Sequence, residues 1–77
     1  MKIHWLDMKY HKELECWFFK QGENEFMMNC GEWFNLRIGE EQGIPCRLEL
    51  AKQWYVVMGP KGVKLNLRTN ETYKVEV

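Results

Sequence analysis

The stretch that decides the fold is Trp33-Phe34-Asn35-Leu36-Arg37-Ile38, followed by Gly39-Glu40-Glu41-Gln42-Gly43 and then by Ile44-Pro45-Cys46-Arg47-Leu48-Glu49-Leu50. Its first and third segments alternate apolar and polar residues, and this period of two is typical of strands with one buried face. The glycines that bound the middle segment favour a hairpin loop, since they adopt positive φ at little cost. We therefore expect an antiparallel hairpin with these residues facing inward: Phe34, Leu36, Ile38, Ile44, Cys46, Leu48 and Leu50. Pro45 lacks an N–H group, which predicts a sheet edge or a bulge near the start of its strand.

The remaining strands are predicted from short aromatic and β-branched runs on both sides of this hairpin. After it come strands over 54–58, 63–67 and 73–77, with Val56 and Met58 in the core. Gly59-Pro60-Lys61-Gly62 is the strongest turn signal in the chain. The first 20 residues fit either a helical stripe or a hairpin, and we favour a hairpin with strands over 2–7 and 13–20.

These elements predict a mainly β fold made from one small domain over residues 1–77. A small antiparallel meander or a partly open, Src-homology-like barrel of about six strands buries one face and limits exposed edges. The chain has 77 residues, four of them Trp, and each large aromatic matters to so small a core.

Composition restricts the classes of function. The formal net charge is zero, which argues against a dedicated duplex-binding protein, since such proteins carry a positive excess. Three widely spaced cysteines, Cys16, Cys30 and Cys46, do not form a disulfide framework. With no signal-peptide core and no long apolar run, we expect a cytoplasmic protein that does not enter membranes.

We find no signature of a catalytic or metal centre, and we expect no cofactor. The histidines and cysteines lack any paired zinc spacing. The chain contains no serine, so a cysteine with a histidine is the remaining nucleophilic arrangement. Cys46 shares the inward parity of its strand, and Cys16 shares parity with Leu14 and Phe18. Because burial raises the pKa of a thiol, neither position suits a nucleophile. The prediction is a protein that is not an enzyme.

The outward faces of the central strands carry the candidate site. If Phe34 and Leu36 face inward, Trp33 and Arg37 face outward, as do Arg47 on the next strand and Tyr55 on the one after. Trp, Tyr and Arg dominate the hot spots of protein interfaces, and Arg beside an aromatic ring can also stack on bases or bind phosphate. Cross-strand pairs of the same types also stabilise sheets, so a purely structural role stays open. The candidate partner-binding residues are Trp33, Arg37, Arg47 and Tyr55.

Three segments together resemble a small family of domains of unknown function found in Firmicutes, their phages and their mobile elements. The matching runs are Asn29-Cys30-Gly31-Glu32-Trp33-Phe34, Ile44-Pro45-Cys46-Arg47-Leu48-Glu49 and Gln53-Trp54-Tyr55-Val56-Val57. The sequence departs from the family at Gly43, where Trp is usual, and in the tail after Gly62. The resemblance implies a small barrel-like β fold and a bacterial or phage host, and it supplies no activity.

Two functions lead as hypotheses, ahead of a small enzyme that uses Cys30 or Cys46. The first is a phage or mobile-element accessory protein that binds a host protein. It would act as an inhibitor of the anti-CRISPR type against a host defence system. The second is a small barrel that binds nucleic acid or a nucleotide with the same arginines and aromatics. A monomer and a homodimer paired through an exposed strand edge both stay open.

Overall fold

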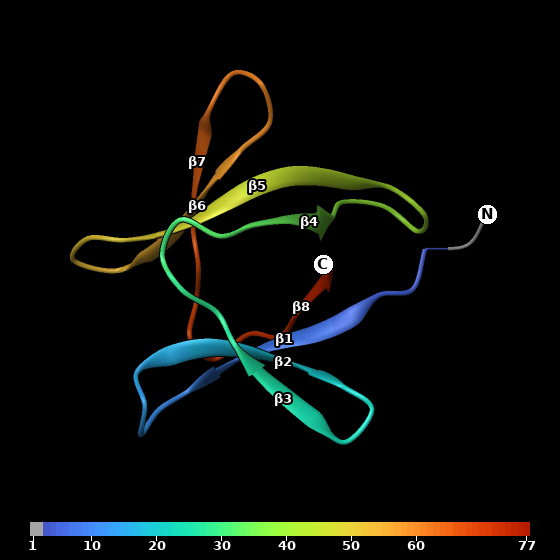
Figure 1. The fold of residues 1–77 in the computed structure, drawn as a ribbon. Coiled ribbons are helices and arrows are strands. Elements are labelled where there is room, and N and C mark those ends of the chain that lie inside the picture. Colours follow the sequence, from blue (N-terminus) through green and yellow to red (C-terminus); the bar gives the residue numbers. More distant parts are fainter. Residues whose placement is uncertain (1–2) are drawn as a thin grey trace.

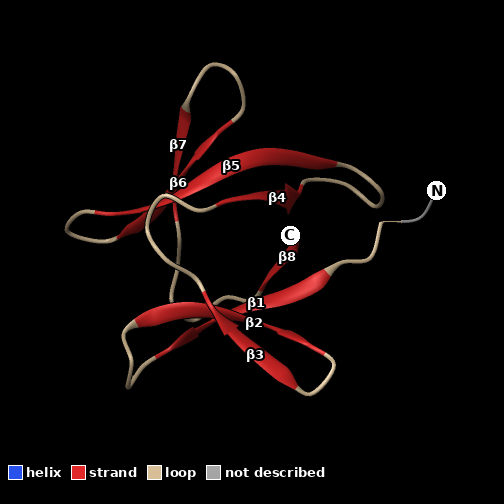
Figure 2. Cartoon of the chain, viewed as in Figure 1, coloured by secondary structure: helices blue, strands red, loops and turns tan. Residues whose placement is uncertain are grey.

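The fold is all β, as the alternating pattern predicts. The structure, a computed structural model, describes residues 3–77. Its strands are β1 (Leu6–His11), β2 (Cys16–Gln21), β3 (Asn24–Met27), β4 (Trp33–Arg37), β5 (Gly43–Leu50), β6 (Trp54–Met58), β7 (Val63–Asn66) and β8 (Tyr73–Glu76). Consecutive strands are linked by turns and loops, and the ribbon contains strands and loops only (Figures 1 and 2). The described part of the chain therefore offers no helix that is long and apolar enough to cross a bilayer.

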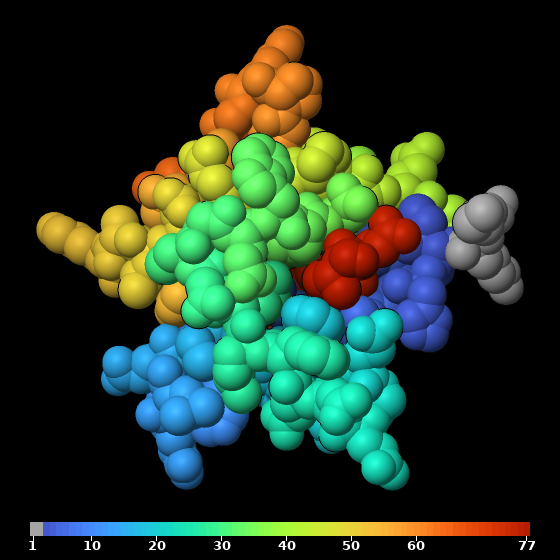
Figure 3. All heavy atoms as spheres, viewed as in Figure 1, coloured from blue at the N-terminus to red at the C-terminus, as the bar shows by residue number. Residues whose placement is uncertain are grey.

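All eight strands belong to one antiparallel sheet in the order β3-β2-β1-β8-β4-β5-β6-β7. The sheet is a meander interrupted once, because the C-terminal strand β8 lies between β1 and β4. β8 pairs with β1 through Leu6–Val75 and with β4 through Leu36–Val75. In Figure 1, β1–β3 and β4–β7 form two halves with β8 between them, and in Figure 3 the red C-terminal segment lies between the blue and green surfaces. β3 and β7 are the two ends of the sheet, which leaves the barrel open, as predicted.

The core lies on the inner face of this coiled sheet. Its fully buried side chains come from five strands and are Met8, Trp17, Cys46, Leu48, Val56 and Val75. Tyr10 and Tyr73 pack edge-on against the Trp17 ring, at centroid distances of 5.4 and 5.7 Å. Edge-to-face aromatic pairs add to the stability gained from burying their area. Trp17 therefore joins β1, β2 and β8 at the centre of one half of the sheet.

The N-terminal hairpin is confirmed, but its predicted boundaries are wrong. The first strand is Leu6–His11 instead of 2–7, and of that range Lys2 lies outside the described residues. The second is Cys16–Gln21. Trp17 and Phe19 face the core, so Cys16 lies on the outer face, half-buried, and Leu14 is exposed in the turn. The inward parity that suggested a buried Cys16 is therefore wrong, whereas Cys46 is buried as predicted.

The central hairpin is confirmed with corrections at its ends. Phe34 and Leu36 pair with Cys46 and Ile44 in β4–β5, all on the inner face. Ile38 and Leu50 were expected in the core, but they are 62% and 50% exposed. Ile38 follows the last residue of β4 and its N–H bonds the Gln42 carbonyl inside the loop. Leu50 is the last residue of β5, where the sheet ends and no further strand covers its inner face.

Pro45 lies in an interior strand whose register with both neighbours is continuous, so the predictions of a sheet edge and of a bulge are both wrong. The Pro45 carbonyl accepts a hydrogen bond from the Gly59 N–H, one residue after β6 ends. In an antiparallel pair the N–H and C=O of one residue face the same neighbour. The N–H that Pro45 lacks would therefore have pointed toward the end of β6. The hydrogen bonds between β5 and β6 end there, and the chain enters the turn 59–62. Gly59 has a φ of +68°, which a side chain would strain.

Candidate functional site: the outer face of the sheet

Trp33 and Arg47 form the centre of the candidate site. They are direct partners in the β4–β5 register, on the outer face. The Arg47 guanidinium carbon lies 5.6 Å from the centroid of the Trp33 ring, the geometry of a cation–π pair. Trp33 is 61% exposed at the start of β4, where it pairs with Arg47 on β5 and lies before the residues of β4 that pair with β8. A rigid sheet thus presents a large aromatic surface to solvent.

Charged and aromatic neighbours extend this pair across β5, β6 and β7. Arg47 Nε lies 3.9 Å from Glu49 Oε1 on the same strand, and Tyr55 is the register partner of Glu49 on β6. The Lys64 ammonium lies over the Tyr55 ring, 4.5 Å from its centroid. We call the following residues the outer patch: Trp33, Arg47, Glu49, Tyr55 and Lys64.

The geometry brings three of the four predicted residues together and leaves Arg37 apart. Arg37 pairs with Gly43 and lies four residues from Trp33, roughly 13 Å along an extended strand. Its Nε donates to the Gly39 carbonyl at 2.7 Å, so its side chain is turned toward the hairpin loop. The outer patch therefore contains Trp33, Arg47 and Tyr55, together with Lys64, which the sequence did not identify.

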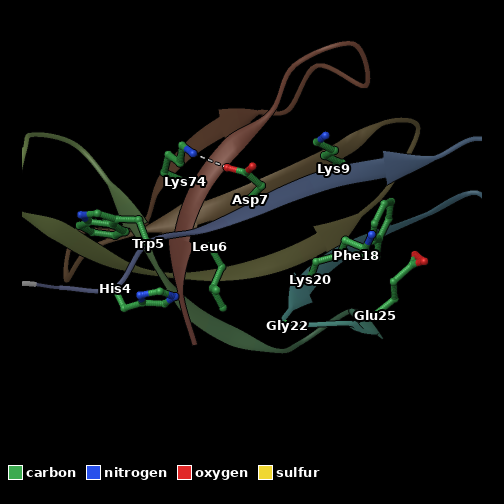
Figure 4. A pocket seen from close by; sticks show the side chains of 10 residues that line it. All are labelled: His4, Trp5, Leu6, Asp7, Lys9, Phe18, Lys20, Gly22, Glu25 and Lys74. Carbon is green, nitrogen blue, oxygen red and sulfur yellow. Dashed lines mark hydrogen bonds and ion pairs between the residues drawn. The ribbon is translucent and has the colours of Figure 1, made fainter.

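A groove lies on the outer face of the other half of the sheet, with a volume of about 430 Å³. Its walls come from the N-terminal arm (His4 and Trp5), from β1, β2, β3 and β8, and from the turn at Gly22 (Figure 4). The arm is held by hydrogen bonds to the loop between β4 and β5. Ile3 N–H donates to Glu41 Oε2 at 2.9 Å, and Trp5 Nε1 donates to the Glu40 carbonyl at 3.1 Å.

Gly43 makes room for this arm. A Cβ atom at residue 43 would lie 3.0 Å from Trp5 Cη2 and 3.2 Å from Asn35 Cβ, closer than ordinary contact. The Trp5 indole therefore occupies the space where a side chain at residue 43 would be. This contact positions one wall of the groove from a residue 38 places away in the sequence.

A second cavity, of about 620 Å³, lies between the turn that follows β1, the β5–β6 hairpin and the loop between β7 and β8. Apolar side chains from both halves of the sheet line it, among them Tyr10, Leu50, Trp54 and Leu67, with polar residues such as Arg68 and Asn70 around them.

The thiols differ in their surroundings. Burial raises the pKa of the Cys46 thiol from 9.0 to about 12, which keeps it protonated in the folded protein at neutral pH. Cys16 Sγ contacts Met27 Sδ at 3.6 Å on the outer face, and Cys30 is exposed in the loop before β4. Within residues 3–77, no three side chains among His, Cys, Asp and Glu gather closely enough to hold a metal ion.

Comparison with protein families identifies the chain over nearly its whole length. A family model described as a domain of unknown function, DUF5348, matches residues 6–77, so the chain belongs to the DUF5348 family. The match begins at the first residue of β1 and includes all eight strands. Comparison with curated proteins and with solved structures gives no match.

Proposed function

We propose that this DUF5348 domain is a protein-binding module, without catalytic activity of its own, that contacts its partner through the outer patch. The observation that carries the proposal is the exposed Trp33 ring, fixed on a strand and covered on one side by Arg47. Trp and Arg truncations are enriched among the largest losses of binding energy at protein interfaces. The protonated, buried Cys46 thiol is a poor nucleophile, which supports a binding function over catalysis.

The resemblance to small domains of Firmicutes, phages and mobile elements supports a narrower form of the proposal. In this form the domain is an accessory protein of a phage or mobile element, and its partner is a protein of the host's defence system, which it inhibits in the bacterial cytoplasm. The three unpaired cysteines agree with a reducing compartment.

The test compares partner capture by matched variants. The wild-type domain, Trp33→Ala, Arg47→Ala and Ile38→Ala are immobilised and exposed to a Firmicutes lysate, and captured proteins are quantified by mass spectrometry. Ile38 is the control because it is as exposed as Trp33 but lies outside the outer patch. We expect one protein that wild type and Ile38→Ala retain and that Trp33→Ala loses by about 30-fold, the factor for a hot spot of about 2 kcal/mol. Equal capture by all four proteins, or no enriched protein with wild type, would contradict the proposal.

Single-stranded nucleic acid is the alternative partner, because an arginine beside an exposed indole can also stack on bases. Fluorescence anisotropy with labelled oligothymidylate distinguishes the two. A nucleic-acid partner requires binding that weakens steeply as salt rises and that Trp33→Ala abolishes. Absence of binding at low salt would remove this alternative.

A further inference from the structure

We infer that the groove formed by β8, β1, β2 and the N-terminal arm binds a single acidic side chain, flanked by apolar residues, from a protein partner. The inference rests on the proposed function only in assigning the acid to a protein. The residues that carry it are Trp5, Asp7, Lys9, Phe18, Lys20 and Lys74, which line the groove (Figure 4).

Cations exceed acids around the centre of the groove. Asp7 and Lys74 are register partners on β1 and β8, and their side chains form an ion pair. Lys9 and Lys20 line the same groove from β1 and β2. Among the residues that the structure describes, neither of these two lysines forms an ion pair with an acid within 4.0 Å. With Asp7 occupied by Lys74 and Glu25 opposite Lys20 on β3, the groove keeps one positive charge in excess, and Lys9, which pairs with Phe18, has no acidic register partner.

Apolar surface lies next to these two lysines. Phe18 is the register partner of Lys9 and is half-buried, with its ring edge-on to His11 at 5.9 Å. The Trp5 indole forms the wall at the opposite end of the groove, four residues from Lys9 along the chain, and is held by its hydrogen bond to Glu40 (Figure 4). A ligand that combines a carboxylate with apolar neighbours thus finds a partner for each part, and burying the apolar part adds affinity that an exposed charge pair alone does not provide.

The acids of the groove favour a discrete carboxylate over a nucleic-acid strand. Glu25 lies opposite Lys20 in the β2–β3 register and lines the groove, and Asp7 lies at its centre. A phosphodiester backbone carries a charge at every nucleotide and would pass both acids. A single acidic side chain needs only the space near Lys9 and Lys20. The net charge of the protein is zero, whereas proteins that bind a nucleic-acid backbone usually carry a positive excess. A local site for one anion needs no such excess.

A peptide titration followed by NMR tests the inference directly. ¹⁵N-labelled protein is titrated with acetyl-Leu-Glu-Phe-amide, with its glutamine analogue acetyl-Leu-Gln-Phe-amide, and with oligothymidylate. We expect the glutamate peptide to shift amides of β1 and β2 around Lys9, Phe18 and Lys20. The glutamine analogue should bind at least about threefold more weakly, the effect of losing a partly exposed charge pair.

Variants locate the binding site. Lys9→Gln combined with Lys20→Gln should weaken the glutamate peptide by a similar or larger factor. Lys61→Gln, in the turn between β6 and β7, is the matched control and should bind as wild type does. The inference is overturned if the peptide causes no shifts, if the shifts lie outside the groove, if both peptides bind equally, or if oligothymidylate displaces the peptide from β1 and β2. Because Trp33 takes no part in this titration, its outcome is independent of the capture experiment on the outer patch.

Discussion

At the residue scale, burial alone separates side chains that the alternating pattern treats as equivalent. Leu48 and Leu50 share a strand and a parity, yet Leu48 is fully buried and Leu50 is half exposed. The difference arises because the inner face is covered only where strands of the other half lie opposite it. The same limit explains Ile38, which continues the pattern of β4 but lies past its last residue.

Leu48→Ala and Leu50→Ala should therefore differ sharply in stability. Truncating a buried leucine leaves a cavity and costs about 2–5 kcal/mol of unfolding free energy, whereas a half-exposed leucine at a strand end should cost less than about 1 kcal/mol. Urea unfolding of the two variants measures both values. Equal losses would show that the inner face is covered as far as residue 50.

Cys46 should make the stability of the protein depend on alkaline pH. Its pKa is raised to about 12 in the folded state, from 9.0. Above pH 9 the unfolded thiol loses its proton while the folded one keeps it, so rising pH stabilises the unfolded state. The contribution of the buried thiol to the free energy of unfolding is therefore fully present below pH 9. It is lost between pH 9 and pH 12, by at most about 1.4 kcal/mol per pH unit.

The variant Cys46→Val isolates this effect. Its unfolding free energy, measured in urea between about pH 8 and pH 10.5, should fall less steeply than that of wild type. Cys30→Ala is the control, since an exposed thiol meets water in both states, and it should keep the wild-type slope. Parallel curves for wild type and Cys46→Val would contradict the prediction.

At the element scale, the hairpins were predictable because their signals are local. Alternation over 33–50, glycines at the turns and short loops together gave β4, β5, β6 and β7 nearly at their observed bounds. β3 was not predicted, because its apolar residues Phe26 and Met27 are adjacent instead of alternating, and all four of its residues are exposed. The stack of Phe26 on Phe19, at 5.2 Å, depends on pairing with β2 and leaves no periodic signal.

The edge strand β7 carries its own protection against pairing. Val63 and Leu65 on its inner face are exposed, with Lys64 between them on the outer face. Two copies of β7 can pair antiparallel in the register that sets Val63 of one copy opposite Leu65 of the other. In that register Lys64 lies opposite Lys64 of the second copy, and like charges directly opposite each other are destabilising.

Lys64→Thr should consequently promote self-association. Threonine favours strands and removes the repulsion while Val63 and Leu65 stay available. Light scattering coupled to size-exclusion chromatography should report a higher mass for Lys64→Thr than for wild type at the same concentration. Lys61→Thr, in the adjacent turn, should behave as wild type does. An unchanged mass for Lys64→Thr would show that other features keep the edge unpaired.

At the scale of the whole molecule, the position of β8 is what the sequence could not reveal. A final strand over 73–77 was predictable, but its partners β1 and β4 lie far away in the chain. Only a few residue pairs join β8 to β4, supported by a hydrogen bond from Asn35 Nδ2 to Glu76 Oε1 at 3.0 Å. This short pairing between β8 and β4 connects the two halves of the sheet, β1–β3 and β4–β7, around one core.

The two sites show the same division between local and distant information. Trp33 and Arg47 could be predicted as neighbours because a short hairpin fixes their register. Arg37 could not be separated from them without knowing its bond to Gly39. The groove escaped prediction because its walls come from residues 4–25 and from Lys74, which only the insertion of β8 brings together.

The register of β4 between β8 and β5 decides which side chains face outward, because a slip of one residue would bury Trp33 and expose Phe34. Interstrand nuclear Overhauser effects on labelled protein measure this register directly. We predict backbone contacts between Leu36 and Val75 and between Trp33 and Arg47, with the Trp33 ring close to the Arg47 side chain and far from Leu48. Contacts that pair Phe34 with Arg47, or a β8 that contacts neither β1 nor β4, would contradict both the fold and the outer patch.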